Sequence, residues 1–473
     1  MRNKIMISSG MKMLCVFMLL LMPAVFMHAQ QTLNSRLQRL MADPLLRTSE
    51  VGISVYDLTQ GQSVFNWQDK KLYRPASVQK LITSVTALSR LGTEYCFQTE
   101  LWTDGEVADG VLKGNLYVRG GFDPEFSDKD MDALANMVRE NGINRVEGSI
   151  VGDVSMKDSL FYGEGWAWDD ARYEFQPCLS PLMYNKGCVQ VSVRPSQRDS
   201  LAHVSVWPES TYYTLVNTAR SYDPAQGKLR IGRDWMWQGN ELSVSGNVTR
   251  TVVRKVPVFD SGQFFLYVFA ERLQRLGIVT STFETGVVPA GARLLGTLSR
   301  PLVQVLDRAL KKSDNLSAEA LFYVLARQHV TDRPVSAADA SEVVTDFISG
   351  LGYDAERYSI ADGSGVSLYN YVSPDLLLGF LVHAYTFREV FDALYEALPI
   401  AGVDGTLAGR MKGTLAHRRV RAKTGTVMGV SSLAGYARAS NGHLLAFVII
   451  NQNVLKGAAA RAFQNKVCVE LCR

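Results

Sequence analysis

Histidine is scarce in this sequence. Only 6 of its 473 residues are histidines, and none of them forms an H-E-x-x-H pair, so a zinc hydrolase of that kind is unsupported. No C-x-x-C occurs, and no run beyond the first thirty residues is long and apolar enough to cross a membrane. Repeats and low-complexity segments are also missing. With 47% hydrophobic and 20% charged residues, the composition is that of an ordinary folded protein of two or three domains.

The first thirty residues differ from the rest of the chain. Three basic residues precede an uncharged run from Met13 to Met27, and His28-Ala29-Gln30 follows it with a small residue. This pattern predicts a secretory signal peptide over residues 1–29, cut near Ala29, and export to the periplasm; a retained N-terminal membrane anchor is the alternative. The three basic residues account for most of the formal net charge of +4. The mature chain is therefore nearly neutral, and a non-specific nucleic-acid binder is not expected.

Cysteine is infrequent, and five cysteines remain once Cys15 is removed with the signal peptide. An odd number cannot all pair within one chain. Cys178 and Cys188 could close a short loop in an oxidising compartment. The other interpretation is that all five thiols are free.

The pattern of apolar residues divides the chain into three stretches. Residues 51–92 read as a hairpin and a helix, and residues 261–473 read mainly as helices before a hairpin at Asn441-Gly442. Between them, short alternating segments are separated by glycine, asparagine, aspartate and proline. We therefore predict a discontinuous catalytic domain over 30–97 and 258–473, interrupted by a mostly β insertion over 98–257 that forms one or two subdomains.

The stretch "RPASVQKLITSVTALSRLG" sets a serine and a lysine three residues apart at the start of a predicted helix. Pro75 at the entry and Gly92 past the end are start and stop signals, and apolar residues recur between them at helical spacing. Side chains at i and i+3 share a helix face, so Lys80 could take the proton of Ser77. That requires a lysine pKa lowered by burial or by a neighbouring cation. Alone, S-x-x-K is a weak signal.

Two further motifs strengthen the interpretation. "SDN" at Ser313–Asn315 interrupts a helical pattern, as a polar loop between helices would. "KTG" at Lys423–Gly425 lies in a predicted strand, where glycine lets a ligand approach the backbone closely. S-x-x-K, S-D-N and K-T-G in this order are the signature of penicillin-binding proteins and related β-lactamases.

The surrounding sequence resembles the class C low-molecular-mass penicillin-binding proteins, a family of D-alanyl-D-alanine carboxypeptidases and endopeptidases. The resemblance covers nearly the whole mature chain, through stretches such as "SDNLSAEAL", "DGSGVSLYNYVSP", "LPIAGVDGTLAGRM" and "VRAKTGT", and through "GVLKGNLYVRGGFDPEF" and "WAWDDARYEFQPCLSPL" in the insertion. The 236 residues from Ser77 to Ser313 favour these peptidases, because β-lactamases have a much shorter gap. One departure is Leu368, where the family usually has an arginine.

The resemblance implies a serine acyl-transfer mechanism. Ser77 would attack the carbonyl between two terminal D-alanines, Lys80 would act as general base, and Ser313 would relay a proton to the leaving amine. Asn315 would hold the substrate amide and orient Lys80. Ser77 at a helix N-terminus suits this chemistry, because free N–H groups and the helix dipole favour negative charge there.

The K-T-G strand would bind the end of the substrate. Lys423 would attract the terminal carboxylate and lower the pKa of Lys80, and Thr424 and Thr426 would hydrogen-bond that carboxylate. Gly425 would allow close approach, and the backbone N–H groups of Ser77 and Thr426 would form the oxyanion hole.

Other residues receive weaker expectations. Asp153 matches the family position that receives the free amine of the peptide's diamino acid; the alternative is a turn aspartate. Structural roles are expected for Asp314, Glu319, Asp362 and Ser364, and burial in the core for the aromatic residues Trp166, Trp168 and Tyr173.

The resemblance further implies an α+β fold, with a penicillin-binding or serine β-lactamase-like domain of antiparallel sheet and helices that carries the large strand-rich insertion. The implied function is a periplasmic serine carboxypeptidase, with endopeptidase activity, that acts on peptidoglycan stem peptides and crosslinks and is acylated by β-lactams. Peripheral contact with the cell wall or membrane would accompany it, and no metal or organic cofactor is implied. The alternatives are a serine β-lactamase, which would need fast deacylation, and a catalytically silent cell-wall-binding protein.

Overall fold

The computed structural model describes residues 33–473, so the predicted signal peptide lies outside the described residues. The chain forms two compact units. Among the described residues, the first contains 33–73, Ser373–Val382 and Pro399–Arg473, and the second contains Arg74–Val372 and His383–Leu398. The predicted insertion over 98–257 falls entirely within the second unit.

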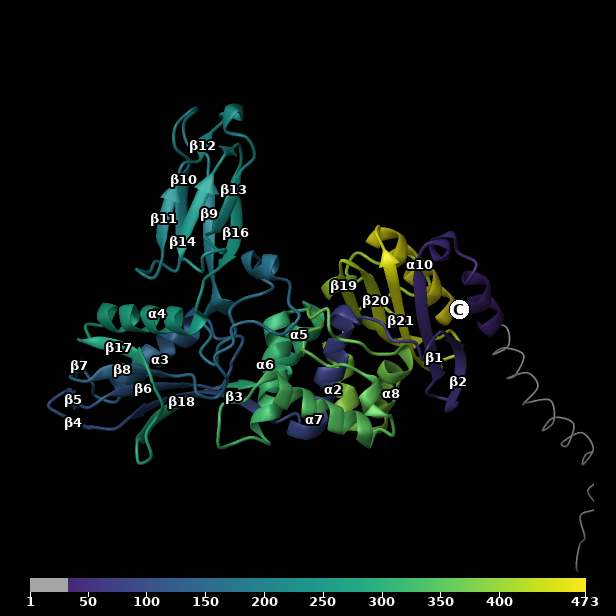
Figure 1. The fold of residues 1–473 in the computed structure, drawn as a ribbon, viewed down its shortest axis with the longest axis horizontal. Helices are drawn as coiled ribbons and strands as arrows, with labels where there is room; N and C mark the ends of the chain where they lie inside the picture. The colour runs from purple at the N-terminus through teal and green to yellow at the C-terminus, as the bar shows by residue number, and fades with distance from the viewer. Residues whose placement is uncertain (1–32) are drawn as a thin grey trace, which may run out of the picture. The chain divides into compact units, whose positions relative to one another are not determined.

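The first unit is built on a five-stranded antiparallel sheet with the order β19-β20-β21-β1-β2 (Figure 1). The hairpin predicted at Asn441-Gly442 is confirmed, since it joins β20 to β21. Its strands are β1 (Glu50–Asp57), β2 (Gln62–Trp67), β19 (Val420–Val427), β20 (Gly429–Arg438) and β21 (Leu444–Val454).

Helices cover both faces of this sheet. Gln464 on α10 (Gly457–Leu471) donates to Ser431 on β20. Five residues further along the same strand, Tyr436 donates to the carbonyl of Leu381 in α8 (Pro374–Thr386). Because side chains alternate along a strand, Ser431 and Tyr436 point to opposite faces. This explains why β20 and β21 are apolar over nearly their whole length rather than alternating.

In the helical part of the second unit, α6 packs against α2, α5 and α7, and α9 packs against α5 and α2 (Figure 1). Residues 316–326 of α6 are all buried, as expected of a helix that is apolar all round. Its helices are α2 (Gln79–Leu91), α5 (Leu302–Lys311), α6 (Asn315–Arg327), α7 (Ala337–Gly350) and α9 (Arg388–Ala397).

The rest of the second unit is rich in strands. A mixed sheet of order β17-β8-β6-β3-β18 packs against α3 (Asp128–Glu140) and α4 (Ser261–Arg275). Its strands are β3 (Cys96–Thr103), β6 (Leu116–Gly120), β8 (Ser149–Asp153), β17 (Thr282–Thr285) and β18 (Arg293–Pro301), so two of the five follow residue 257. Beside it is a small sheet of β4 (Glu106–Ala108), β5 (Val111–Lys113) and β7 (Arg145–Val146).

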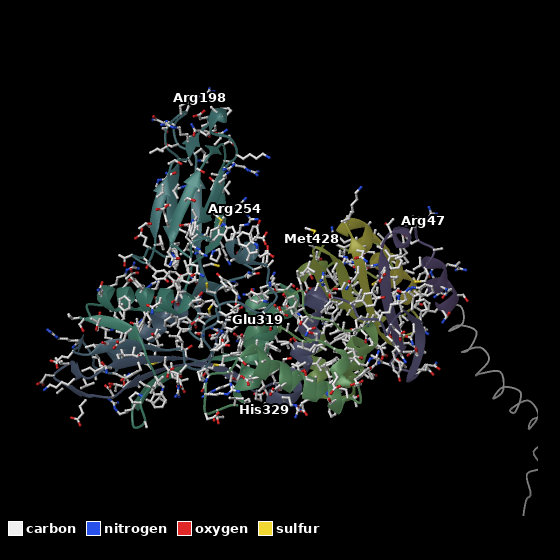
Figure 2. All side chains as sticks on the ribbon, in the orientation of Figure 1. Arg47, Arg198, Arg254, Glu319, His329 and Met428 are labelled. Atoms are coloured by element: carbon white, nitrogen blue, oxygen red, sulfur yellow. The ribbon has the colours of Figure 1, made fainter. Side chains whose placement is uncertain are left out.

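A second group of strands includes Arg254, and the loop between two of its strands carries Arg198; Figure 2 labels both residues. One of its sheets has the order β10-β9-β16, from His203–Trp207, Cys188–Arg194 and Val252–Pro257. Another has the order β11-β14-β13, from Thr214–Asn217, Glu241–Ser245 and Arg230–Arg233. The third pairs β12 (Arg220–Ser221) with β15 (Asn247–Val248). The predicted mostly β character of this region is confirmed.

The cysteines of residues 33–473 are all free thiols. The sulfur of Cys178 lies 3.2 Å from the hydroxyl of Tyr162, and that of Cys188 donates to the carbonyl of Lys186. The short-loop disulfide is therefore not formed, because each sulfur faces a different polar group. None of the helices within these residues reaches the length and hydropathy of a membrane span.

Candidate active site

The predicted helix start brings the serine and the lysine together. Ser77 lies in a 3-10 turn, η2 (Ala76–Val78), and Lys80 is the second residue of α2. The first turn is thus 3-10 rather than α, but Lys80 Nζ still lies 3.0 Å from Ser77 Oγ. Ala76 has a φ of +51°, which is uncommon for a residue with a side chain and typical of a strained functional turn.

Lys80 is fully buried, and its hydrogen-bond partners show which atom can interact with the lone pair of its neutral amine. Nζ lies 2.7 Å from Asn315 Oδ1 and 2.6 Å from the carbonyl of Ser364, and both oxygens can only accept. A neutral amine that donates to both has its lone pair left for Ser77, whose hydroxyl can donate. Burial lowers the pKa of Lys80 to about 8, although nearby carboxylates act in the opposite direction.

The S-D-N motif joins α5 to α6, as the sequence predicts. Ser313 has a φ of +59° and Asp314 caps α6 by accepting from the backbone N–H of Ser317 at 2.8 Å. Asp314 also pairs with Lys186 at 3.1 Å, so its expected loop-ordering role is confirmed. Asn315 turns its oxygen to Lys80, while its Nδ2 donates to the carbonyl of Phe175 at 2.8 Å.

A loop over residues 361–370 supplies the third partner of Lys80. Glu319, which lies on α6 and is labelled in Figure 2, accepts from the backbone N–H groups of Gly363 at 3.3 Å and Ser364 at 2.9 Å. Glu319 therefore positions the peptide whose carbonyl contacts Lys80. Burial, followed by the charge of Asp362, raises the pKa of Glu319 to about 8. Sequence reasoning expected only packing or capping; the available signal was a carboxylate in an otherwise apolar helix.

The K-T-G motif lies on β19 in the first unit, in the predicted strand. Lys423 is buried and donates to the carbonyl of Thr424 at 2.6 Å, while the hydroxyl of Thr424 contacts that of Thr406 at 2.8 Å. Gly425 pairs with Ser432, and the hydroxyl of Thr426 donates to the carbonyl of Gly425 at 2.8 Å. β19 ends the sheet order, and residues 399–401 pair with its outer edge only at residues 420–422. The part of that edge that carries the K-T-G motif can therefore accept an extended peptide.

Asp153 lies apart from the serine and the lysine. It ends β8 and lines a cavity of about 720 Å³ together with Arg327, at the opposite end of α6 from Asn315. The rise of an α-helix separates those two ends by roughly 18 Å. Its carboxylate oxygens accept from the backbone N–H groups of Ser155 and Val288, each at 2.9 Å. This geometry fits the turn-aspartate interpretation.

The three aromatic residues expected in the core behave differently. Trp166 is half-buried, and its Nε1 donates to Asp362 at 2.9 Å. Trp168 is 72% exposed and Tyr173 is 42% exposed, so the expectation of burial is wrong for both. Across residues 33–473, histidine, cysteine, aspartate and glutamate form no cluster suited to a metal ion.

A serine facing a buried, partly neutral lysine in this α+β fold defines a serine hydrolase of the penicillin-binding type. The chain belongs to the D-Ala-D-Ala carboxypeptidase 3 (S13) family, whose model matches residues 33–471. It is accordingly a serine-type D-Ala-D-Ala carboxypeptidase, and the predicted family, fold class and enzyme class are confirmed.

Individual relatives agree with this assignment. The chain is 31% identical over 472 residues to the D-alanyl-D-alanine carboxypeptidase of Actinomadura sp. (strain R39), covering 93% of this chain and 84% of that protein. The crystal structure of penicillin binding protein 4 (dacB) from Haemophilus influenzae matches with a TM-score of 0.80 and 26% identity, over 90% of this chain and 97% of that one. The same protein complexed with a novel β-lactam matches with a TM-score of 0.75 and 25% identity, over 92% and 99%.

Proposed function

We propose that this protein is exported to the periplasm, where it hydrolyses peptidoglycan stem peptides through an acyl-enzyme formed on Ser77. The observation that carries the assignment of Ser77 is the arrangement around Lys80. Two acceptor-only oxygens occupy its N–H groups, and the remaining partner is the Ser77 hydroxyl. The same residues would cut crosslinks, because a crosslink presents the same kind of D-alanyl carbonyl.

The proposed acylation step transfers one proton, forms a bond from Ser77 Oγ to the substrate carbonyl carbon and breaks the C–N bond to the terminal D-alanine. Neutral Lys80 takes the Ser77 proton as Oγ bonds to the substrate carbonyl carbon, and the backbone N–H groups of Ser77 and Thr426 receive the oxyanion. The C–N bond to the terminal D-alanine then breaks, and the proton passes through Ser313 to the leaving amine. Water later releases the acyl group and restores the serine.

Substrate binding is assigned to the remaining motif residues. Lys423, Thr424 and Thr426 are proposed to hold the terminal carboxylate, and Gly425 allows the peptide to run along the edge of β19. Asn315 is proposed to bind the substrate amide through Nδ2 while it orients Lys80 through Oδ1. Asp153 is proposed to be structural, because backbone N–H groups occupy both of its oxygens.

The intact mass of the mature protein after incubation with benzylpenicillin tests the proposal. We expect an adduct of one drug mass on the wild-type protein and on Ser84→Ala, and none on Ser77→Ala. Ser84 is the matched control because it is a buried serine of α2, the helix that follows the turn of Ser77. The β-lactam complex of the Haemophilus influenzae protein supports the choice of probe.

The outcomes separate the competing functions. A lasting adduct on Ser77→Ala would contradict the choice of nucleophile, provided that the variant unfolds at the wild-type temperature. Drug consumed without an adduct would indicate a β-lactamase, and intact drug without an adduct would indicate a silent binding protein. Assays on D-alanyl-D-alanine peptides and on crosslinked muropeptides then measure the two peptidase activities separately.

A further inference from the structure

Four aromatic rings and one guanidinium form a continuous row in the second unit, which we call the aromatic row. The rings of Trp168 and Trp235 lie 5.1 Å apart, centroid to centroid. Arg172 stands over Trp235 at 5.7 Å and over Tyr173 at 4.9 Å. The rings of Tyr173 and Phe175 are stacked at 5.5 Å. Each member therefore contacts the next, although Trp235 comes from the turn between β13 and β14.

One end of the aromatic row reaches the active site. The carbonyl of Phe175 accepts a hydrogen bond from Asn315, which also contacts Lys80. The segment that carries most of the row is anchored again at Trp166, whose Nε1 donates to Asp362. The row is thus continuous with the catalytic groups and leads away from them to Trp168.

Three of the four rings of the aromatic row are exposed, and Trp235 is half-buried. Trp168 is 72%, Tyr173 42% and Phe175 43% exposed. A contiguous exposed aromatic patch usually marks a binding surface. Contacts between neighbouring rings fix their orientations before any ligand arrives, so little side-chain entropy is lost on binding.

The chemistry of the row fits a saccharide. Flat rings can cover the apolar faces of pyranose sugars, and Arg172 offers hydrogen bonds to hydroxyl and N-acetyl groups. Asp169 and Asp234, which follow Trp168 and precede Trp235 in the sequence, are exposed carboxylates.

We propose that the aromatic row binds the glycan strand of peptidoglycan, so that the enzyme holds the sugar chain together with its attached stem peptide. This inference rests on the proposed function, because the peptide in the active site is covalently joined to an N-acetylated sugar. Four residues of the pentapeptide lie between the scissile bond and the sugar, and four extended residues span at most about 14 Å. The near end of the row lies beside the catalytic groups, because the carbonyl of Phe175 accepts a hydrogen bond from Asn315, which contacts Lys80.

Paired substrates test the inference on the mature protein. We compare a disaccharide-linked pentapeptide with the bare pentapeptide in Trp168→Ala and Trp235→Ala. Loss of one stacking contact should raise KM for the sugar-linked substrate about three- to tenfold. KM for the bare peptide and kcat for both should stay at the wild-type values. Trp168→Phe should retain most of the affinity, and Leu215→Ala, which removes an exposed apolar side chain on β11, should change neither KM.

Three results would overturn the inference. The first is an equal rise of KM for both substrates in the tryptophan variants, and the second is no change of KM for either substrate. The third is a molecular mass in solution that differs between the variants and the wild-type protein, which would mean that the row covers a second copy of the chain. Isothermal titration with peptide-free glycan chains gives an independent measurement. We expect binding by the wild-type protein and by Ser77→Ala, and loss of binding in Trp168→Ala. If the wild-type protein hydrolyses neither the sugar-linked nor the bare pentapeptide, the proposed function fails. The isothermal titration with glycan chains then still tests whether the aromatic row binds glycan.

Discussion

Lys80 shows how a buried lysine becomes a base. Its side chain is removed from water, which disfavours the charged ammonium, while Asn315 and Ser364 offer oxygens that bind either protonation state. Burial therefore lowers the pKa of Lys80 to about 8, against the opposing charges of Asp362, Glu319 and Asp314.

Acylation by benzylpenicillin should accordingly depend on pH. Lys80 takes the Ser77 proton only when it is neutral, so the second-order rate constant should rise with pH and level off above about 8. Stopped-flow acylation at pH values from about 6 to about 9.5 measures this. Lys157→Met is the matched control, because burial also lowers the pKa of Lys157 but its Nζ bonds to Asp158. A midpoint near the ordinary pKa of lysine would count against Lys80 as the base. A pH profile of Lys157→Met that differs from the wild-type profile would also count against it.

At the scale of elements, the loop over residues 361–370 is fitted between α6 and the nucleophile turn. A Cβ on Gly363 would lie 2.6 Å from Phe322 Cβ on α6. Gly365 has a φ of +79°, and a Cβ there would collide with the carbonyl oxygen of Ala76, which precedes Ser77. The loop thus needs glycine for close approach as well as for backbone conformation.

Gly365→Ala should slow acylation at least tenfold, because the colliding carbonyl belongs to the turn that holds Ser77. Gly352→Ala is the matched control, since Gly352 has a φ of +88° and open space around it. The control should lose about 1 kcal/mol of stability from backbone strain and keep its acylation rate. Acylation rates and thermal unfolding of both variants measure the effect; equal behaviour of the two would refute the steric argument.

At the scale of the whole molecule, the described chain holds its cysteines as free thiols in a protein expected to be exported. Cys178, Cys188, Cys468 and Cys472 are buried, and Cys96 is partly exposed. Burial protects thiols from reagents and oxidants, since reactivity requires access and a thiolate. Burial raises the pKa of Cys188 to about 12, which suppresses its thiolate further.

Thiol titration of the mature protein should give one fast-reacting group in the native state, assigned to Cys96. All five should react after denaturation without a reductant. Cys96→Ser should abolish the native reaction and leave four groups after denaturation. A count of three in the denatured wild-type protein would reveal one disulfide and contradict the free-thiol structure.

The sequence by itself determined the family, the fold class and the positions of the three motifs. The pairing of Ser77 with Lys80 needs only the local geometry of a helix start, and the S-D-N motif needs only a break between two helical patterns. Tertiary structure alone decided the surroundings of Lys80, because Ser364 lies 284 residues away from it in the chain. It also decided that Trp168 is exposed and that Asp153 lies beyond the far end of α6. Burial and long-range contact depend on how distant segments pack, which periodicity and motif spacing do not encode.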